Sequence, residues 1–267
     1  MPRLAVVGHV EWVDFIPIER FPRRGEVVHG EGSFARAAGG GGVVAVVLAE
    51  LFGAEVDFYT ALGDDASGRA AVEQLTARGV SVHAAWRADQ PTRRALTLLE
   101  ATGERTIITA GERLEPRGED DLDWERLAQT DGVYFTAGDA AALQNARQAT
   151  TLVASPRGRA ALADGPMLDA LVFSHSDPDE SQWARQLEPK ARVVVETRGA
   201  AGGVWWGEET GSWEAVAPGG PARDAYGCGD SFAAGFTFGL AAGRSLAEAA
   251  ALGAHAGARM LTRRGAP

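Results

Sequence analysis

Short apolar runs alternate with longer segments of helical periodicity along most of this chain. The first run, residues 4–7, ends at Gly8 and is typical of a buried parallel strand. Residues 55–62 predict a second strand, and residues 66–78 predict a helix that stops at Gly79. The alternation continues with strands predicted at 80–86, 133–136, 151–154, 171–173 and 192–197, and with helices at 139–149, 231–242 and 245–261. Alternating strands and helices require crossover connections, so we expect a mostly parallel sheet with both faces covered.

Two regions interrupt this alternation. Residues 11–36 spread aromatic side chains among charges, prolines and glycines, which predicts short strands that project from the main body as a lid. Residues 92–100 and 105–110 alternate around Thr102-Gly103 and predict a β-hairpin. A later hairpin is predicted from residues 203–206 and 212–216. No linker or repeat separates these regions, so we expect a single domain over 1–267, with lid strands from about 11–36 and 92–110.

A run of glycines, Gly39 to Gly42, leads into an apolar segment at residues 43–52 that is closed by Gly53. The length of the segment and its terminal glycine favour a helix buried on most sides. Its valines leave a β-strand as the competing interpretation.

Composition narrows the class of protein. The 45% hydrophobic and 23% charged residues are those of an ordinary globular protein. A net charge of −10 argues against a nucleic-acid groove and against adhesion to an anionic membrane, but it does not prevent a local site from binding ATP. The single cysteine excludes an internal disulfide and a cysteine-based zinc site. With no apolar run near about 20 residues and an amino-terminal run too short for a signal peptide, we expect a cytoplasmic protein.

Residues 224–230 read Asp-Ala-Tyr-Gly-Cys-Gly-Asp and stand directly before a predicted helix. Gly227 and Gly229 allow the backbone to turn tightly and to approach a ligand. A glycine turn at a helix start offers free N–H groups and suits a phosphate. Asp230 then has two interpretations, a base for a hydroxyl brought to that phosphate or an ordinary helix N-cap.

Five features follow one another in a fixed order: the glycine run at 39–42, Gly63-Asp64-Asp65, the hairpin after Thr92, Thr197 to Gly202, and residues 224–230. In that order they resemble the ribokinase-like, or PfkB-type, carbohydrate kinase family over nearly the whole chain. The resemblance implies a three-layer α/β/α fold with a mostly parallel central sheet and a small β-strand lid.

The resemblance also implies ATP-dependent transfer of the γ-phosphate to a hydroxyl of a sugar or sugar-like small molecule. Asp230 corresponds to the catalytic base of the family, and the backbone of Gly227, Cys228 and Gly229 corresponds to its anion hole. The positions that bind the nucleotide correspond to Thr197, Gly199, Gly202 and, on the adenine side, His255. Mg²⁺ is expected to arrive with ATP. Asp224 matches a position that binds a monovalent cation such as K⁺ in some members.

On the substrate side, Asp14 and the glycines Gly40 and Gly41 fall in the sugar-binding regions of the family. Asp14 stands one residue later than is usual, so Glu11 is the alternative residue to face the substrate. Val44 replaces an asparagine that hydrogen-bonds the sugar in the family, which puts ribose-type recognition in doubt. The segment 174–180 also lacks the asparagine of the family's Asn-x-x-Glu element, and Asp179 or Glu180 is the candidate for its acidic, magnesium-related part.

Two alternatives to a sugar kinase stay open: a nucleoside kinase, and a catalytically weak relative that binds a small ligand. A dinucleotide-dependent oxidoreductase is excluded, because the glycine run lies far from the first strand and contains no G-x-G-x-x-G. Lid-mediated dimers occur in the family, so a homodimer through these strands is a further expectation.

Overall fold

The computed structural model describes residues 1–186 and 190–267, which form one large and one small sheet. The large sheet has nine strands within these residues, in the order β13-β12-β11-β10-β9-β8-β1-β4-β5. Neighbouring strands from β11 through β5 are parallel, whereas β12 and β13 are antiparallel at one edge. In chain order these strands are β1 Arg3–Val7, β4 Glu55–Gly63, β5 Val80–Arg87, β8 Gly132–Phe135, β9 Thr151–Ala154, β10 Leu168–Ser174, β11 Ala191–Thr197, β12 Gly203–Gly207 and β13 Gly211–Trp213.

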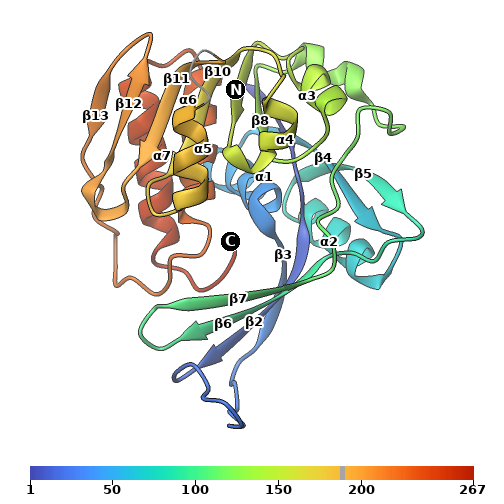
Figure 1. The fold of residues 1–267 in the computed structure, drawn as a ribbon, viewed down its shortest axis with the longest axis vertical. Helices are drawn as coiled ribbons and strands as arrows, with labels where there is room; N and C mark the ends of the chain where they lie inside the picture. Colours follow the sequence, from blue (N-terminus) through green and yellow to red (C-terminus); the bar gives the residue numbers. More distant parts are fainter. Residues whose placement is uncertain (187–189) are drawn as a thin grey trace.

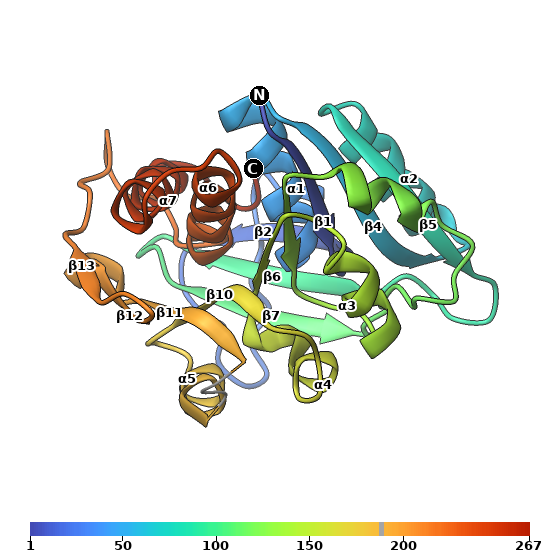
Figure 2. The same ribbon diagram turned by 90° about the horizontal axis from the view of Figure 1, so that it is seen from above.

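Helices cover both faces of the large sheet, which makes the three layers expected from the sequence (Figures 1 and 2). One face is covered by α1 Gly39–Phe52, α2 Ala66–Thr76, α6 Cys228–Ala241 and α7 Leu246–Met260. The other is covered by α3 Ala140–Ala146, α4 Arg159–Leu162, α5 Pro178–Gln186 and the 3-10 segment η1 Trp124–Gln129. The strand interiors are almost entirely apolar, as burial on both faces requires. The predicted fold class is therefore confirmed.

The glycine run lies inside α1 and does not merely precede it. The segment 43–52 is helical, so the competing β-strand interpretation is wrong. Gly53 ends the helix with a left-handed φ of 65° and donates its N–H to the carbonyl of Ala49, while the next N–H, of Ala54, donates to the carbonyl of Leu48. A Cβ on Gly41 would lie 2.7 Å from the carbonyl oxygen of His9, so glycine is required where α1 meets the loop after β1.

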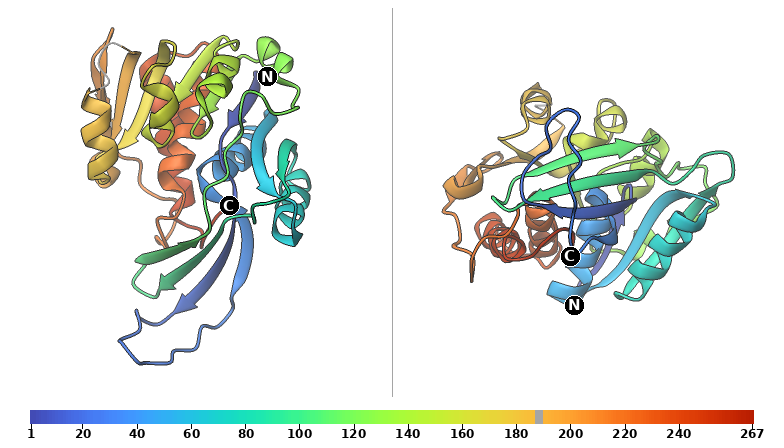
Figure 3. Two further views of the ribbon diagram at one scale, coloured as in Figure 1. Left: turned by 45° about the vertical axis from the view of Figure 1, so that its right-hand side comes forward. Right: turned by 90° about the horizontal axis from the view of Figure 1, so that it is seen from below.

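The small sheet, called the lid sheet below, has the order β3-β2-β6-β7 and projects from the body (Figures 1 and 3). Its strands are β2 Glu11–Ile18, β3 Phe34–Ala38, β6 Arg94–Glu100 and β7 Arg105–Ala110. Glu11, Val13 and Phe15 form the buried face of β2. Phe15 stacks on Phe34 and meets Tyr226 edge to face, each with ring centroids 5.0 Å apart, so this face packs against the segment before α6.

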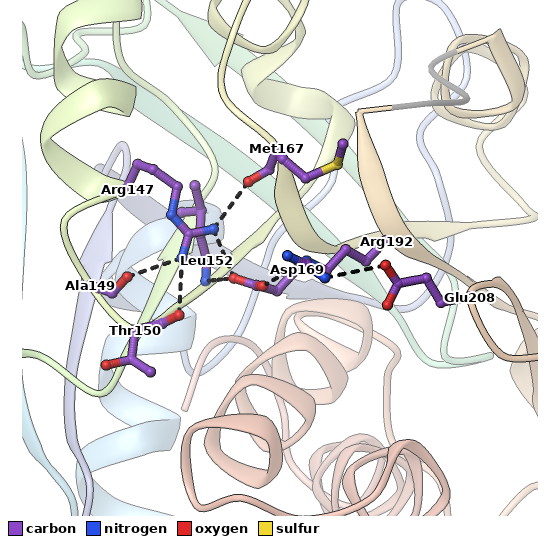
Figure 4. Close-up of polar contacts among 8 residues, drawn as sticks. All are labelled: Arg147, Ala149, Thr150, Leu152, Met167, Asp169, Arg192 and Glu208. Atoms are coloured by element: carbon purple, nitrogen blue, oxygen red, sulfur yellow. Dashed lines mark hydrogen bonds and ion pairs between the residues drawn. The ribbon is translucent and has the colours of Figure 1, made fainter.

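The amino ends of β9, β10 and β11 are joined by one polar network on the edge of the sheet opposite the strand carboxyl ends (Figure 4). Asp169 accepts from the backbone N–H of Leu152 and from Arg147, both at 2.8 Å. Arg147 also donates to the carbonyls of Met167, Ala149 and Thr150, each at 3.0 Å. Arg192 lies 3.6 Å from Asp169 and pairs with Glu208 at 3.2 Å. The network satisfies backbone groups that three strand ends leave open.

The elements that the sequence reading omitted are short or weakly periodic: α4, α5 and η1. The predicted strand at 212–216 is shorter in the structure, since β13 ends at Trp213. Among residues 1–186 and 190–267, no helix combines the length and the apolar character that crossing a membrane demands.

Candidate active site

The carboxyl ends of the parallel strands bring several polar side chains together beneath the lid sheet. His9 follows β1, Thr136 follows β8, and Arg157 follows β9. Thr136 and Ser155 share a hydrogen bond of 3.1 Å between their hydroxyls. A crevice outside the strand carboxyl ends is the usual ligand site of an open α/β sheet, so this edge is the candidate active site.

Asp230 lies in the first turn of α6, two residues inside the helix. The N-cap is Gly227, whose φ is 72°, and no side chain caps the helix, so the N-cap interpretation of Asp230 is wrong. Oδ1 of Asp230 accepts a hydrogen bond of 2.8 Å from Nη1 of Arg157. Among the described residues, Oδ2 has no hydrogen-bond donor. The Asp230 side chain is 14% exposed, so the carboxylate is not fully buried.

The turn before Asp230 leaves backbone donors free. Within the part of the chain that the structure describes, the amides of Gly227, Gly229 and Asp230 have no hydrogen-bond partner. The amide of Cys228, which the sequence reading placed in the anion hole, donates to the carbonyl of Ala225 at 3.3 Å. Among residues 1–186 and 190–267, no atom lies within 4 Å of a Cβ built on Gly229, so the surface that these residues form there is open. Free N–H groups at the positive end of a helix dipole suit a phosphate.

A second helix begins at the same place. The first turn of α1 carries no acidic residue and no side-chain cap. A Cβ on Gly40 would lie 2.6 Å from Nη1 of Arg157 and 3.4 Å from Oδ1 of Asp230. The bare backbone of α1 therefore reaches the Arg157–Asp230 pair, and two helix amino ends converge on one carboxylate.

The two acidic candidates on β2 face in opposite directions. Glu11 is buried, 8% exposed, and its Oε2 lies 3.3 Å from Nε of Arg93. Burial raises the pKa of Glu11, against the opposing charges of Arg93, Arg157 and Arg113. Asp14 lies on the other face of β2, is about one-third exposed, and pairs with Arg94 at 2.6 Å. The structure thus brings Glu11 toward Asp230 and keeps Asp14 away from it.

The residues predicted to bind the nucleotide lie on two surfaces. Thr197 ends β11 and donates to the carbonyl of Phe173 at 3.3 Å. Gly199 opens a 3-10 turn with φ 57°, and a Cβ built on it has no atom of the described residues within 4 Å. On Gly202, with φ 74°, a Cβ would lie 2.1 Å from the carbonyl oxygen of Trp213, so this glycine is required for the approach of β13. The backbone just after β11 is therefore open to a ligand at Gly199.

His255 lies on α7 beside a mainly apolar cavity of about 510 Å³. The cavity is lined in part by Val216, Ala217, Leu252 and Ala256. Nδ1 of His255 is 2.8 Å from the carbonyl oxygen of Ala251, which holds the ring on the helix. An apolar cavity with few polar groups is the usual setting for a planar ligand such as a purine base.

Two of the three predicted metal-binding residues, Glu180 and Asp224, already accept hydrogen bonds from other groups of the chain. Glu180 is buried and accepts from Nε of Arg157 at 3.1 Å, and burial raises its pKa. Asp179 is exposed and lines an open cavity of about 500 Å³ with Glu180, Arg113 and Arg157. Both oxygens of buried Asp224 accept backbone N–H groups, from Tyr226 and Gly265, at 2.7 Å each. Asp224 thus ties the turn before α6 to the carboxyl-terminal segment, and its role in binding a monovalent cation stays a prediction.

The sequence reading missed a buried carboxylate at the end of β11. The Glu196 side chain is 1% exposed and is surrounded by His175 at 2.7 Å, Arg198 at 2.9 Å and Arg185 at 3.2 Å. Burial acts to raise its pKa, but the hydrogen bonds from Arg198 and His175 outweigh burial and lower it. A charged residue within the apolar run of this strand was the available signal.

The arginines of the site were also missed. Arg157 joins Asp230 to Glu180, and Nη2 of Arg113 donates to the carbonyl of Arg157 at 3.0 Å. The position of Arg157, just after a buried strand and a Ser-Pro pair, was the only local signal.

Solved structures share this architecture over the whole chain. A ribokinase of Arabidopsis thaliana, complexed with ribose and ATP, matches 99% of this chain and 94% of its own with a TM-score of 0.78 at 21% identity. A ribokinase of Thermotoga maritima matches 100% of this chain and 95% of its own with a TM-score of 0.77, also at 21% identity. These likenesses show that the chain has the ribokinase-like α/β fold.

The family follows from sequence. The model of the pfkB family of carbohydrate kinases matches residues 1–172 and 168–267. An ATP-dependent ribose-1-phosphate kinase of Halopiger xanaduensis is 30% identical over 256 residues, which cover 88% of this chain and 84% of that protein. The chain belongs to the pfkB family of carbohydrate kinases, and it is an enzyme that transfers a phosphoryl group from ATP to a sugar.

Proposed function

We propose that Asp230 is the base that takes the proton from the acceptor hydroxyl as that oxygen attacks the γ-phosphorus of ATP. The observation that carries this role is the position of the carboxylate between the amino ends of α1 and α6, with Oδ2 free of donors among the described residues. Phosphoryl transfer asks chiefly for positioning and for stabilisation of charge, with one acceptor for the proton.

The free amides of Gly227, Gly229 and Asp230 act as the anion hole for the transferring phosphoryl group. Because these donors are fixed by the turn and by α6, they need no reorganisation as charge develops on the equatorial oxygens. Support comes from the open space in front of Gly229.

The nucleotide lies along the end of β11 and α7. The open backbone at Gly199, with Thr197 beside it, faces the phosphates and ribose, and the cavity beside His255 takes the adenine. Glu196 positions this region, because it holds Arg198 next to Thr197 through a bond of 2.9 Å.

Mg²⁺ accompanies ATP and is held mainly by phosphate oxygens and water, as is usual for this ion. The described residues include no cluster of three or more His, Cys, Asp or Glu side chains suited to a metal ion. Asp179 is the carboxylate that would accept a hydrogen bond from a magnesium-bound water, since it lines the open cavity while Glu180 is already paired with Arg157. Bound Mg²⁺ would supply charge neutralisation to the triphosphate.

The lid sheet closes over the acceptor and also contacts a second copy of the chain. Its outward face carries Leu96 and, opposite it in register, Ile108, which is 53% exposed. Light scattering of the wild-type protein and of Ile108→Glu tests this contact. A dimer that the variant weakens supports it, and a monomeric wild-type protein contradicts it.

Release of ADP from MgATP over a panel of acceptors tests the proposed function. The panel contains ribose, ribose 1-phosphate, hexoses, hexose phosphates and nucleosides, with an acceptor-free reaction as the control. Acceptor-dependent ADP release with a sugar supports the proposal, and release with nucleosides alone would favour a nucleoside kinase. Binding of an acceptor without ADP release would contradict the proposed role of Asp230.

A further inference from the structure

Three arginines from separate segments converge beside Asp230. Arg93 precedes β6, Arg113 follows β7, and Arg157 follows β9. Arg113 donates to the carbonyl of Arg157, Arg157 donates to Asp230, and Arg93 pairs with Glu11. The three guanidinium groups therefore surround the space between Glu11 and the predicted base.

Each guanidinium has at least one nitrogen without a hydrogen-bond partner among the described residues. Arg157 uses Nε for Glu180 and Nη1 for Asp230, and its Nη2 has no partner among the described residues. Arg113 uses Nε and Nη2 for Glu115 and for the carbonyl of Arg157, while the described residues offer no hydrogen bond to Nη1 of Arg113 or to either Nη of Arg93. The side chains of Arg93, Arg113 and Arg157 are 21%, 29% and 39% exposed, so a ligand reaches them without unfolding the site. A guanidinium has five N–H donors in a planar fork that fits a phosphate with two bonds at once.

A buried, unpartnered nitrogen lies in the same place. His9 is 7% exposed, and its Nδ1 is buried without a hydrogen-bond partner among the residues described. Its ring lies against the start of α1, where a Cβ on Gly39 would be 3.1 Å from Nε2. Burial, followed by the charges of Arg113, Arg157 and Arg93, lowers the pKa of His9 well below its usual value, which agrees with three arginines close to the ring.

Binding of a neutral sugar does not require three arginines beside Asp230. Hydroxyl groups are served by neutral donors and acceptors, whereas three arginines with unpartnered N–H groups favour an anion. The Arg157–Asp230 pair adds a mechanistic reason. A base must be accessible to the hydroxyl, and an anionic group on the acceptor would compete with Asp230 for Nη1 of Arg157. Binding of such an acceptor would then also free Oδ1, beside Oδ2, which has no donor among the described residues.

We propose that the acceptor is a sugar that already carries a phosphate monoester, and that Arg93, Arg113 and Arg157 bind that phosphate. The proposal rests on the proposed kinase function and names the class of its acceptor. The product is a sugar bisphosphate. The transferred γ-phosphoryl group leaves ADP, forms a bond to a sugar hydroxyl oxygen, and the hydroxyl proton passes to Asp230.

The first experiment compares matched pairs of neutral and phosphorylated sugars: ribose with ribose 1-phosphate, glucose with glucose 1-phosphate and glucose 6-phosphate, and fructose with fructose 6-phosphate. We expect kcat/KM at least 100-fold higher for a phosphorylated member of one pair. A neutral sugar that is turned over as well as its phosphates would overturn the inference and leave the kinase function intact. Absence of ADP release with every acceptor would overturn both. A sugar acid preferred over all the phosphates would show an anion site for carboxylate and would also overturn the phosphate assignment.

The second experiment measures binding without ATP, so that it does not depend on turnover. Calorimetry should give at least tenfold tighter binding of the preferred phosphorylated sugar to the wild-type protein than to Arg157→Gln, with MgATP affinity changed less than twofold. Arg157→Lys, which keeps the charge, should restore part of the affinity. Arg244→Gln is the control, because Arg244 is an exposed arginine of the loop before α7 whose ion-pair partner is Glu248 in the first turn of that helix. Equal affinity of the phosphorylated sugar for the wild-type protein and Arg157→Gln contradicts the inference.

Discussion

Nη1 of Arg157 donates to Oδ1 of Asp230 at 2.8 Å, and this contact joins the loop after β9 to the first turn of α6. The same arginine donates to Glu180 through Nε, so its guanidinium bridges two carboxylates. One oxygen of Asp230 is thereby fixed, while the other has no donor among the described residues. An oriented carboxylate with one open oxygen is what a proton acceptor for a hydroxyl needs.

Gly227 and Gly229 are required for different reasons, Gly227 for the backbone conformation of the turn and Gly229 for the open space in front of the anion hole. Gly227→Ala places a Cβ at a φ of 72° and 3.1 Å from Val43, so we expect a loss of about 1–2 kcal/mol in the free energy of unfolding. Gly229→Ala meets no atom within 4 Å and should change stability by less than about 1 kcal/mol. Because its methyl group enters the open surface of the anion hole, the second variant should nevertheless lose at least tenfold in kcat. Urea denaturation and steady-state kinetics of both variants check this. Normal kcat in Gly229→Ala would contradict an anion hole at this turn.

Glu196 gives a stability that depends on pH. Its pKa is lowered in the folded state, since the bonds from Arg198 and His175 outweigh the effect of burial. The carboxylate therefore contributes stability above the ordinary glutamate pKa of about 4.3, and this contribution is lost as pH falls through the lower folded-state value. Glu196→Gln should cost about 1.5–3 kcal/mol at pH 7, and the difference from wild type should shrink below pH 4.3. Denaturation at several pH values measures it. A difference that is constant across this range would show that the charge is not responsible.

Arg147 and Arg192 both belong to the network at the amino ends of the strands, but Arg147 is more buried and makes more hydrogen bonds (Figure 4). Arg147, 27% exposed, serves three carbonyls and Asp169, so Arg147→Met should lower the free energy of unfolding by about 2–3 kcal/mol. Arg192 and Glu208 are 54% and 62% exposed, so Arg192→Gln should cost less than about 1 kcal/mol. Both variants should keep wild-type kcat when folded, because the network lies opposite the strand carboxyl ends. Equal costs for the two substitutions would contradict the assigned roles.

Much of the fold could be predicted from local patterns. The strands at 4–7, 55–62 and 80–86 and the hairpin around Gly103 appear in the structure almost as the sequence indicates. These elements are long enough or periodic enough for propensity and pattern to agree. The short helix α5 was missed because its pattern is charged and its apolar face is small.

The site could be predicted only in part. Asp230 and its glycines stand in one short segment, so a local motif reveals them. Arg157 and Asp230 are 73 residues apart, and their contact depends on how β9 and α6 pack, which no local pattern encodes. The opposite directions of Glu11 and Asp14 depend likewise on which face of β2 is buried. Tertiary packing thus determines the charged surroundings of the base.

Substitution of Asp230 by asparagine tests the central claim most directly. The variant keeps the size and most of the hydrogen bonding of the side chain but cannot accept the hydroxyl proton, and general-base catalysis contributes about 10²–10⁴-fold. Asp89→Asn, at an exposed loop position, is the control. Turnover should be measured with MgATP and the best acceptor of the panel, and nucleotide affinity by calorimetry. The account predicts a loss of at least 100-fold in kcat for Asp230→Asn, with nucleotide affinity within about threefold of wild type. A variant that retains near-normal kcat would show that Asp230 is not the base.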